Sequence, residues 1–263
     1  MYAIEYQRAK SVADAAAALA RTGGKALAGG QSLVGAMKLR LANPGTVVDL
    51  SGIAELKGIK KEGDAIAIGA LTTHAEVASS PVVKQAIPAL AALAEGIGDR
   101  QVRNRGTIGG SLANNDPAAD YPAAVLGLNA TVHTNKRKIA ADDFFKGMYE
   151  TALAADEIIT AVSFPVPKKA AYVKFPNPAS RFALVGVFVA QTGAGLRVAI
   201  TGAASHVHRS SALEAELAKS FTADAAKAVK ISADSLNTDL HGSAEYRAHL
   251  VSVMAARAVT AAG

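Results

Sequence analysis

Two glycine pairs, Gly29-Gly30 and Gly109-Gly110, limit what this chain can fold into more than any other feature of its sequence. Each pair belongs to a turn rich in small polar residues, and the two turns read Ala28-Gly29-Gly30-Gln31-Ser32-Leu33 and Thr107-Ile108-Gly109-Gly110-Ser111-Leu112-Ala113-Asn114-Asn115-Asp116-Pro117-Ala118-Ala119-Asp120. Glycine lets backbone N–H groups approach a ligand, and serine, asparagine and aspartate side chains can hydrogen-bond phosphate, ribose or ring atoms. The two turns together predict one large phosphate-bearing cofactor that is held from two sides.

The first turn has the order strand, glycine turn, helix. Residues 25–28 are predicted as a strand, and Ser32 stands where a helix over residues 33–40 begins. Such a helix presents free N–H groups and its positive dipole end to an anion, although the pattern also fits an ordinary strand-to-helix connection. Before the second turn, Arg100, Arg103 and Arg105 fit either salt bridges or contacts to a pyrophosphate.

The composition excludes several classes of function. Without cysteine, the chain can hold no disulfide, zinc–thiolate site or cysteine-ligated iron–sulfur cluster of its own. The formal charge of +6 is spread along the sequence, and 5% aromatic residues without tryptophan do not favour a nucleic-acid platform. No apolar run approaches the ~20 residues that span a bilayer, and no signal peptide is visible, so we expect a cytoplasmic protein.

The periodicity predicts an α+β protein with two parts, residues 1–167 and 168–263, that meet at Pro165-Val166-Pro167. The first part divides into lobes over about residues 1–55 and 56–167. Its predicted elements are helices over 12–21, 33–40 and 82–95, the last kinked or divided at Pro88, and strands over 25–28, 46–50, 66–68, 130–134 and 157–164. The second part is a small α+β domain with a three-stranded antiparallel sheet over 171–175, 184–190 and 196–201, then helices over 211–219, 223–236 and 244–262.

Three histidines are candidates for chemistry, but each also has an ordinary structural explanation. His74 fits a surface or capping histidine as well as a catalytic one, and His206 and His208 form half a metal site without further ligands at useful spacing. The sequence also contains no G-x-G-x-x-G after a strand, no phosphate-binding G-x-x-x-x-G-K-[ST], no G-x-S-x-G and no H-E-x-x-H. These absences disfavour a Rossmann dinucleotide fold, a P-loop protein, an α/β-hydrolase and a zincin.

The two turns, in this order, closely resemble those of the flavin subunit of molybdenum hydroxylases, the family of the carbon monoxide dehydrogenase medium subunit and the xanthine dehydrogenase flavin domain. Met37-Lys38-Leu39-Arg40 after the first turn and the segment 242–247 near the C-terminus also fit this family, so the resemblance covers nearly the whole chain. It implies a two-lobed FAD-binding domain of the vanillyl-alcohol oxidase type, followed by a smaller α+β domain.

Carried over by position, the resemblance implies a set of FAD-binding residues. Backbone N–H groups of the first turn would hold the pyrophosphate, the second turn would contact the opposite side of the cofactor, and Tyr172 is a candidate for stacking on the isoalloxazine. The implied residues are Ala28, Gly29, Gly30, Gln31, Ser32, Leu33, Thr107, Ile108, Gly109, Gly110, Ser111, Asn114, Asp120, Ile159, Tyr172 and Lys174. No residue is expected to act as a general acid or base. The segment Asn177–Phe182 departs from the Gly-Asp-aromatic segment of many relatives, which leaves its role open.

The resemblance further implies an oxidoreductase complex in which this chain binds FAD non-covalently and relays electrons. A large subunit with a molybdenum cofactor would oxidise the substrate, and a small subunit with two [2Fe-2S] clusters would pass electrons to the FAD, in a dimer of heterotrimers. The terminal acceptor stays open between oxygen, a nicotinamide and a quinone. Two alternatives remain: a self-contained FAD oxidase of a small alcohol or amine, which a covalent flavin at His74 would favour, and a flavin-free assembly protein.

Overall fold

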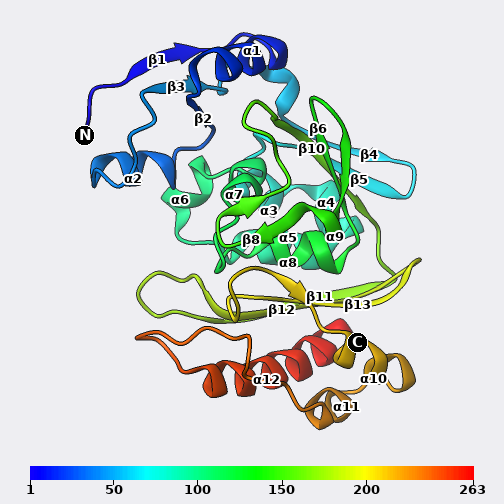
Figure 1. The fold of residues 1–263 in the computed structure, drawn as a ribbon. Helices are drawn as coiled ribbons and strands as arrows, with labels where there is room; N and C mark the ends of the chain where they lie inside the picture. Colours follow the sequence, from blue (N-terminus) through cyan, green and yellow to red (C-terminus); the bar gives the residue numbers. More distant parts are fainter.

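The computed structural model describes residues 1–263, which form three tiers that run from the first lobe at the top of Figure 1 to a C-terminal layer at the bottom. The first lobe is a parallel three-stranded sheet in the order β1-β3-β2 with two helices. Helix α1 begins after Ser11, whose side chain accepts a hydrogen bond from the Asp14 N–H, and ends at Gly23 in the left-handed conformation. The elements are β1 (Glu5–Arg8), α1 (Val12–Thr22), β2 (Lys25–Leu27), α2 (Leu33–Lys38) and β3 (Thr46–Asp49).

The second lobe is an antiparallel five-stranded sheet in the order β4-β5-β10-β6-β7, with helices packed beside it. Its strands are β4 (Ile59–Glu62), β5 (Ala65–Gly69), β6 (Thr131–Thr134), β7 (Lys138–Ala140) and β10 (Ile159–Pro165), and a hairpin of β8 (Phe145–Gly147) and β9 (Glu150–Thr151) lies outside the sheet. Its helices are η1 (Ala54–Leu56), α3 (His74–Ser79), α4 (Pro81–Ala86), α5 (Pro88–Glu95), α6 (Arg100–Arg105), α7 (Ile108–Asn114), α8 (Tyr121–Gly127) and α9 (Ala141–Phe144).

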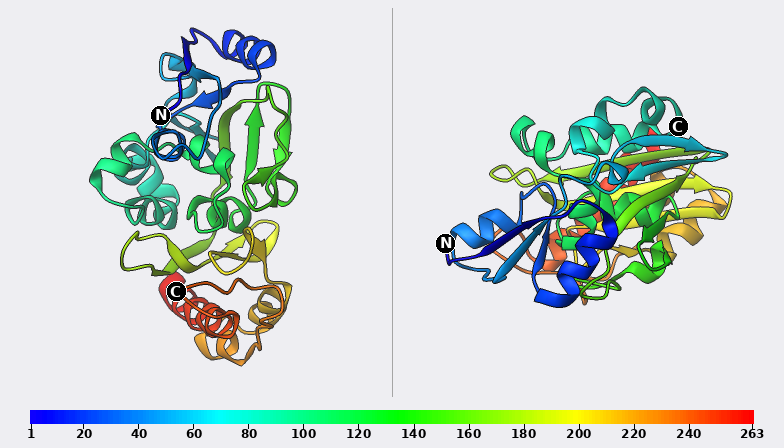
Figure 2. Two further views of the ribbon diagram at one scale, coloured as in Figure 1. Left: turned by 60° about the vertical axis from the view of Figure 1, so that its left-hand side comes forward. Right: turned by 90° about the horizontal axis from the view of Figure 1, so that it is seen from above.

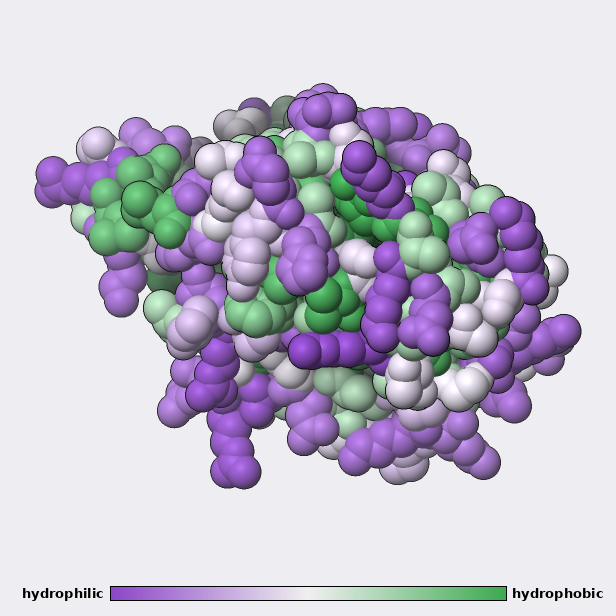
Figure 3. Space-filling model, turned by 90° about the horizontal axis from the view of Figure 1, so that it is seen from below, coloured by the Kyte–Doolittle hydropathy of each residue, from purple (hydrophilic) through white to green (hydrophobic).

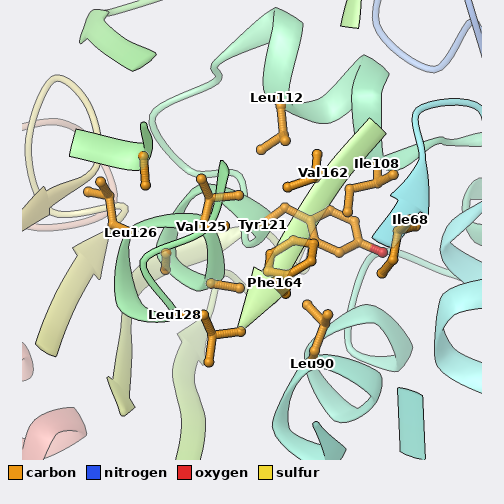
Figure 4. Close-up of a cluster of buried hydrophobic side chains, with 14 of the residues drawn as sticks. Ile68, Leu90, Ile108, Leu112, Tyr121, Val125, Leu126, Leu128, Val162 and Phe164 are labelled. Atoms are coloured by element: carbon orange, nitrogen blue, oxygen red, sulfur yellow. The ribbon is translucent and has the colours of Figure 1, made fainter. Parts of the chain in front are cut away.

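Proline and large apolar side chains explain how these helices are placed. Pro88 divides the predicted long helix into α4 and α5, because Ile87 before it takes a non-helical conformation with a φ of −139° and a ψ of 69°. The fully buried Tyr121 and Phe164 lie at the centre of the core, with Leu90 and Val162 around them (Figure 4). Burying an apolar side chain such as Phe164 stabilises the fold by roughly 1.5–3 kcal/mol, whereas the buried Tyr121 hydroxyl has no hydrogen-bond partner and offsets part of the gain from its ring.

The C-terminal layer is an antiparallel sheet in the order β11-β12-β13-β14 with α10, α11 and α12. The predicted three-stranded sheet is wrong by one strand, because the two-residue β14 pairs with β13 and is too short to show an alternating pattern. The predicted helix over 223–236 is also too long, since α11 stops at Ala228 and Val229 is extended. The elements are β11 (Lys169–Pro176), β12 (Ala183–Thr192), β13 (Gly195–Thr201), β14 (His208–Arg209), α10 (Ser211–Lys219), α11 (Ala223–Ala228) and α12 (Ala244–Ala262).

Strand β12 joins this layer to the rest of the protein because both of its faces are buried. Phe188 points into the core of the second lobe, and a Cβ on Gly127 of α8 would lie 2.6 Å from its ring. The next residues along the strand, Val187 and Val189, pack with α12 on the opposite face. The sheet is therefore a middle layer between the helices of the second lobe and α12 (Figure 2).

The face on the α12 side carries hydrophilic side chains around separate hydrophobic groups (Figure 3). No helix of the protein, including the 19-residue α12, is both long and apolar enough to cross a membrane.

Candidate functional site

The structure brings the two glycine turns together between the first and second lobes. A Cβ atom on Gly29 would lie 2.0 Å from the Arg105 carbonyl oxygen and 2.9 Å from the Gly106 Cα. A Cβ atom on Gly110 would lie 3.6 Å from the Ala28 Cβ. Only glycine at position 29 allows the backbones to approach this closely, so the first turn is seated directly against the second.

The first turn presents an uninterrupted run of free backbone donors. No N–H group of residues 28–33 donates a hydrogen bond within the chain, and the first bond that leads into α2 runs from the Val34 N–H to the Gly30 oxygen at 3.2 Å. Gly30 has a φ of 79°, and Ser32 precedes α2 without capping it through its side chain. Such a run of N–H groups at a helix start suits an anion with several acceptor oxygens.

The second turn differs, because its N–H groups are engaged by the protein itself. Residues 108–111 all donate within the chain: Gly109 to the Ala70 oxygen at 2.9 Å, and Gly110 to the Thr107 Oγ1 at 3.2 Å. A Cβ atom on Gly109 would lie 2.6 Å from the Ala70 Cβ. The glycine at 109 is therefore required for close packing of the backbone against β5 and the loop that follows it.

The polar side chains of the second turn fall into two groups. Ser111 and Asn114 make no side-chain hydrogen bond within the chain and are half-buried, so both can bind a ligand. The neighbouring Asn115 is fully buried with a φ of 43°, and its Nδ2 donates to the Gly147 and Glu150 oxygens at 2.8 Å each. Of the two adjacent asparagines, Asn115 supports the hairpin and Asn114 is free.

Three of the predicted site residues converge at the boundary between the second lobe and the C-terminal layer. The Tyr172 hydroxyl donates to the Asp120 Oδ1 at 2.6 Å, and the Lys174 Nζ lies 3.0 Å from the same oxygen. Lys174 also donates to the Gly96 and Arg181 oxygens at 2.9 Å each. Burial raises the pKa of Asp120, while Lys174 and Tyr172 oppose this by stabilising its charged form.

Two of the residues implied to lie near the flavin ring, Tyr172 and Ile159, also contact the apolar core. The Tyr172 ring is stacked on Phe188, with centroids 6.2 Å apart. Ile159 is the first residue of β10, is 5% exposed, and pairs in register with Thr134 of β6 as part of the apolar core. The contacts of Tyr172 and Ile159 with the flavin ring stay predictions.

His74 is buried, so the expectation of a surface histidine is wrong, and the helix cap is its neighbour Thr73. The backbone N–H of His74 donates to the Gly106 oxygen at 2.9 Å, and a Cβ on Gly106 would lie 2.5 Å from the His74 Nε2. Burial and the charge of Arg103 lower the pKa of His74 to about 4. A neutral His74 therefore packs against the backbone that leads into the second turn. The sequence did not reveal this role, because Gly106 is distant from His74 along the chain.

The three arginines before the second turn make no ion pair. The guanidinium of Arg103 donates to the Ile97 and Gly98 oxygens at 2.9 and 3.0 Å, and it therefore holds the start of α6. Arg100 and Arg105 are exposed. The salt-bridge alternative is wrong for all three arginines.

Comparison with known proteins identifies the family of this chain and the cofactor that the family binds. The family model described as the FAD binding domain in molybdopterin dehydrogenase matches residues 2–167. The chain belongs to this family. As an FAD-binding subunit it is 38% identical to the nicotine 6-hydroxylase medium subunit of Paenarthrobacter nicotinovorans, over 99% of this chain and 98% of that protein. It is 36% identical to the carbon monoxide dehydrogenase medium chain of Hydrogenophaga pseudoflava, over 98% and 96% of the two chains.

Solved structures agree with the sequence comparison. A chain of the carbon monoxide dehydrogenase from Hydrogenophaga pseudoflava superposes with a TM-score of 0.89 at 36% identity, covering 99% of this subunit and 97% of that chain. A chain of quinoline 2-oxidoreductase from Pseudomonas putida 86 gives the same TM-score at 29% identity, covering 99% and 97%. The resemblance predicted from the two turns is confirmed: this is an FAD-binding medium subunit of an oxidoreductase complex.

The donor set of the site fits this cofactor. The diphosphate of FAD is an anion with several oxygen acceptors, and residues 28–33 supply unpartnered N–H groups at the start of a helix. Nowhere in the chain are three or more histidine, aspartate or glutamate side chains arranged to hold a metal ion.

Proposed function

We propose that this subunit holds FAD across the junction of its two glycine turns and relays electrons through it. Residues 28–33 bind the diphosphate through their N–H groups, while Ser111 and Asn114 hydrogen-bond the cofactor from the opposite side. The flavin ring lies beside Asp120, Tyr172 and Lys174, and Ile159 contributes an apolar contact. The observation that carries this proposal is the unbroken run of free donors in the first turn.

Asp120 controls the charge next to the ring. Its carboxylate is held by the Tyr172 hydroxyl and the Lys174 ammonium, so its position is fixed before any cofactor binds. A fixed charge and hydrogen-bonding group near a flavin tunes the redox potential, whereas the bound FAD itself supplies the electron-transfer chemistry. The contribution of this chain is to bind the FAD, to orient it and to shield it.

The partners follow from the family. The similar proteins are called medium subunits or medium chains, and such chains belong with a small and a large subunit. Because this chain has no cysteine, any thiolate-ligated cluster lies on another chain. We infer that a small subunit with [2Fe-2S] clusters delivers electrons, that a large subunit carries the molybdenum cofactor, and that the complex is a dimer of heterotrimers.

The same proposal divides the chain at residue 167, with a two-lobed FAD domain of the vanillyl-alcohol oxidase type before it. The end of the family match at that residue supports the division. A self-contained oxidase with a histidine-linked flavin is less well supported, because the Nε2 of His74 lies against Gly106 and the residue is only 5% exposed.

Flavin retention tests the proposal directly. The purified chain is expected to be yellow and to release FAD, identified by mass, after acid precipitation. The Gly110→Val variant is expected to lose the flavin, because its side chain would enter the space beside Ala28, and to lose some stability as well, because its Cβ would lie 2.9 Å from the Thr107 Oγ1 that caps α7. A colourless wild-type chain that takes up no added FAD, or a variant with full flavin stoichiometry, would contradict the assignment.

A further inference from the structure

The turn between β8 and β9 presents two large apolar side chains to solvent. Met148 is 54% exposed and Tyr149 is 59% exposed. Tyr149 has a φ of 57°, a left-handed conformation that is strained for a bulky residue. Strained residues persist where the surrounding structure holds them, and they concentrate at functional positions.

The turn is fastened to the second glycine turn by a buried amide. The Nδ2 of Asn115 donates to the oxygens of Gly147 and Glu150, one on each side of the turn, and the Tyr149 N–H donates back to the Asn115 oxygen at 3.2 Å. The Tyr149 hydroxyl adds a bond to the Asp116 Oδ2 at 3.3 Å. Because Asn115 directly follows α7, these bonds fasten the β8–β9 hairpin beside the second glycine turn, and Figure 1 shows β8 near α7.

We propose that Met148 and Tyr149 are the docking contact for the small iron–sulfur subunit, at the point where electrons enter this chain. The inference rests on the proposed electron relay and deepens it. Electron transfer between proteins weakens steeply with distance, so the donor subunit must dock next to the segment that holds the flavin. The pair is continuous with that segment through Asn115 and Asp116.

The chemistry of the pair also fits a protein partner. Methionine and tyrosine are enriched at the centres of interfaces, where a few buried anchors carry most of the binding energy. Anchors that are already fixed in the free chain lose little conformational freedom on binding. The strained backbone and its amide brace supply this preorganisation.

The test uses the whole complex, purified through a tag on this chain from cells that make all of its subunits. Met148→Asp places a charge in the proposed contact, and Leu240→Asp places the same charge on a fully exposed leucine of the C-terminal layer. The Met148 variant is expected to lower the iron-to-flavin ratio of the purified complex by roughly tenfold or more, with unchanged flavin per chain. The Leu240 variant is expected to keep the wild-type ratio.

Tyr149→Gly separates docking from folding. Glycine adopts a positive φ freely, so the variant chain is expected to melt at the wild-type temperature or above it while its complex loses iron. Iron retained at the wild-type ratio in the Met148 and Tyr149 variants would overturn the docking proposal alone. The docking proposal would also be overturned if the variants lost a second copy of this chain and kept their iron. A wild-type complex that contains flavin but no iron would instead refute the proposed electron relay.

Discussion

The two glycine turns are alike in sequence and opposite in their hydrogen bonding. In residues 28–33 no backbone N–H has a partner within the chain, whereas in residues 108–111 every N–H has one. Both turns also contain a glycine with no room for a side chain, Gly29 against the Arg105 oxygen and Gly109 against Ala70. The two turns therefore differ in their free N–H groups and not in the closeness of their packing. Under the proposed function the first turn is the ligand cradle and the second is a packing joint.

The largest effect that separates the two roles is expected from Gly109→Ala. The added methyl would lie 2.6 Å from the Ala70 Cβ and 2.8 Å from the Ala70 oxygen, so the backbone must shift. We expect the free energy of unfolding of the flavin-free chain to fall by roughly 3 kcal/mol, measured by urea denaturation. The matched control is Gly35→Ala in α2, where a Cβ would meet nothing within 4 Å. The control is expected to be neutral or to gain up to about 1 kcal/mol. Equal stability of both variants would remove the packing role of Gly109.

A second prediction concerns pH, because only the second turn has a titratable group packed against it. Burial holds the pKa of His74 at about 4 in the folded chain, below its ordinary value of 6.5. The unfolded chain therefore binds the proton more readily, so the stability contributed by neutral His74 is complete above the ordinary pKa and is lost as pH falls toward the folded one. Between about pH 7 and about pH 5 this loss amounts to roughly 2 kcal/mol.

Thermal melts of the flavin-free chain at these two pH values check this expectation. His74→Phe keeps a ring in the site and removes the titration, so its stability is expected to fall less than that of the wild type over the same range. Burial also lowers the pKa of His133 and of His208, but the wild type and the variant share these two groups, so the difference between the two proteins reports on His74. An identical pH dependence in the variant and the wild type would rule out His74 as the source.

Local signals in the sequence were enough to predict much of the fold. Helices α10 and α12 begin at the predicted residues 211 and 244, where the structure shows that Ser210 and Ser243 cap them, and Pro88 divides α4 from α5. Such features depend on neighbours a few residues away. The short β14 depends instead on pairing with β13, and the early end of α11 depends on the packing of Val229 against the C-terminal core.

Contacts within the candidate site also join residues that are far apart in the sequence, and local patterns do not predict them. The glycine pairs were visible in the sequence, but the acceptor of the Gly109 N–H is Ala70, which no local pattern connects with it. Asn114 and Asn115 look equivalent in the sequence, and only the distant hairpin engages one of them. The ion pair of Asp120 with Lys174 likewise joins two layers of the fold.

A third and smaller effect is expected when the Asp120 cluster is altered. Asp120→Ala should weaken FAD binding by roughly 1–3 kcal/mol, because it removes a buried hydrogen-bonding group and leaves Lys174 without its carboxylate partner. Titration of the flavin-free chain with FAD measures this change. Tyr172→Phe is the control, since it keeps the ring stacked on Phe188 and removes only the hydroxyl, and it should cost less. Unchanged affinity in the Asp120 variant would exclude this residue from the site.

The smallest effect is expected at Ser32 and is the most selective test of the first turn. Its side chain makes no capping hydrogen bond and is exposed, so Ser32→Ala should leave the unfolding free energy of the flavin-free chain unchanged. If the hydroxyl contacts the cofactor, FAD affinity should fall by about 1 kcal/mol. Thr107→Ala is the counterpart in the second turn, where the hydroxyl accepts the Gly110 N–H and caps α7, so its loss should lower stability by about 1 kcal/mol. A stability loss at Ser32 equal to that at Thr107 would contradict the division into cradle and joint, because it would mean that the first turn is also held by its own side chains.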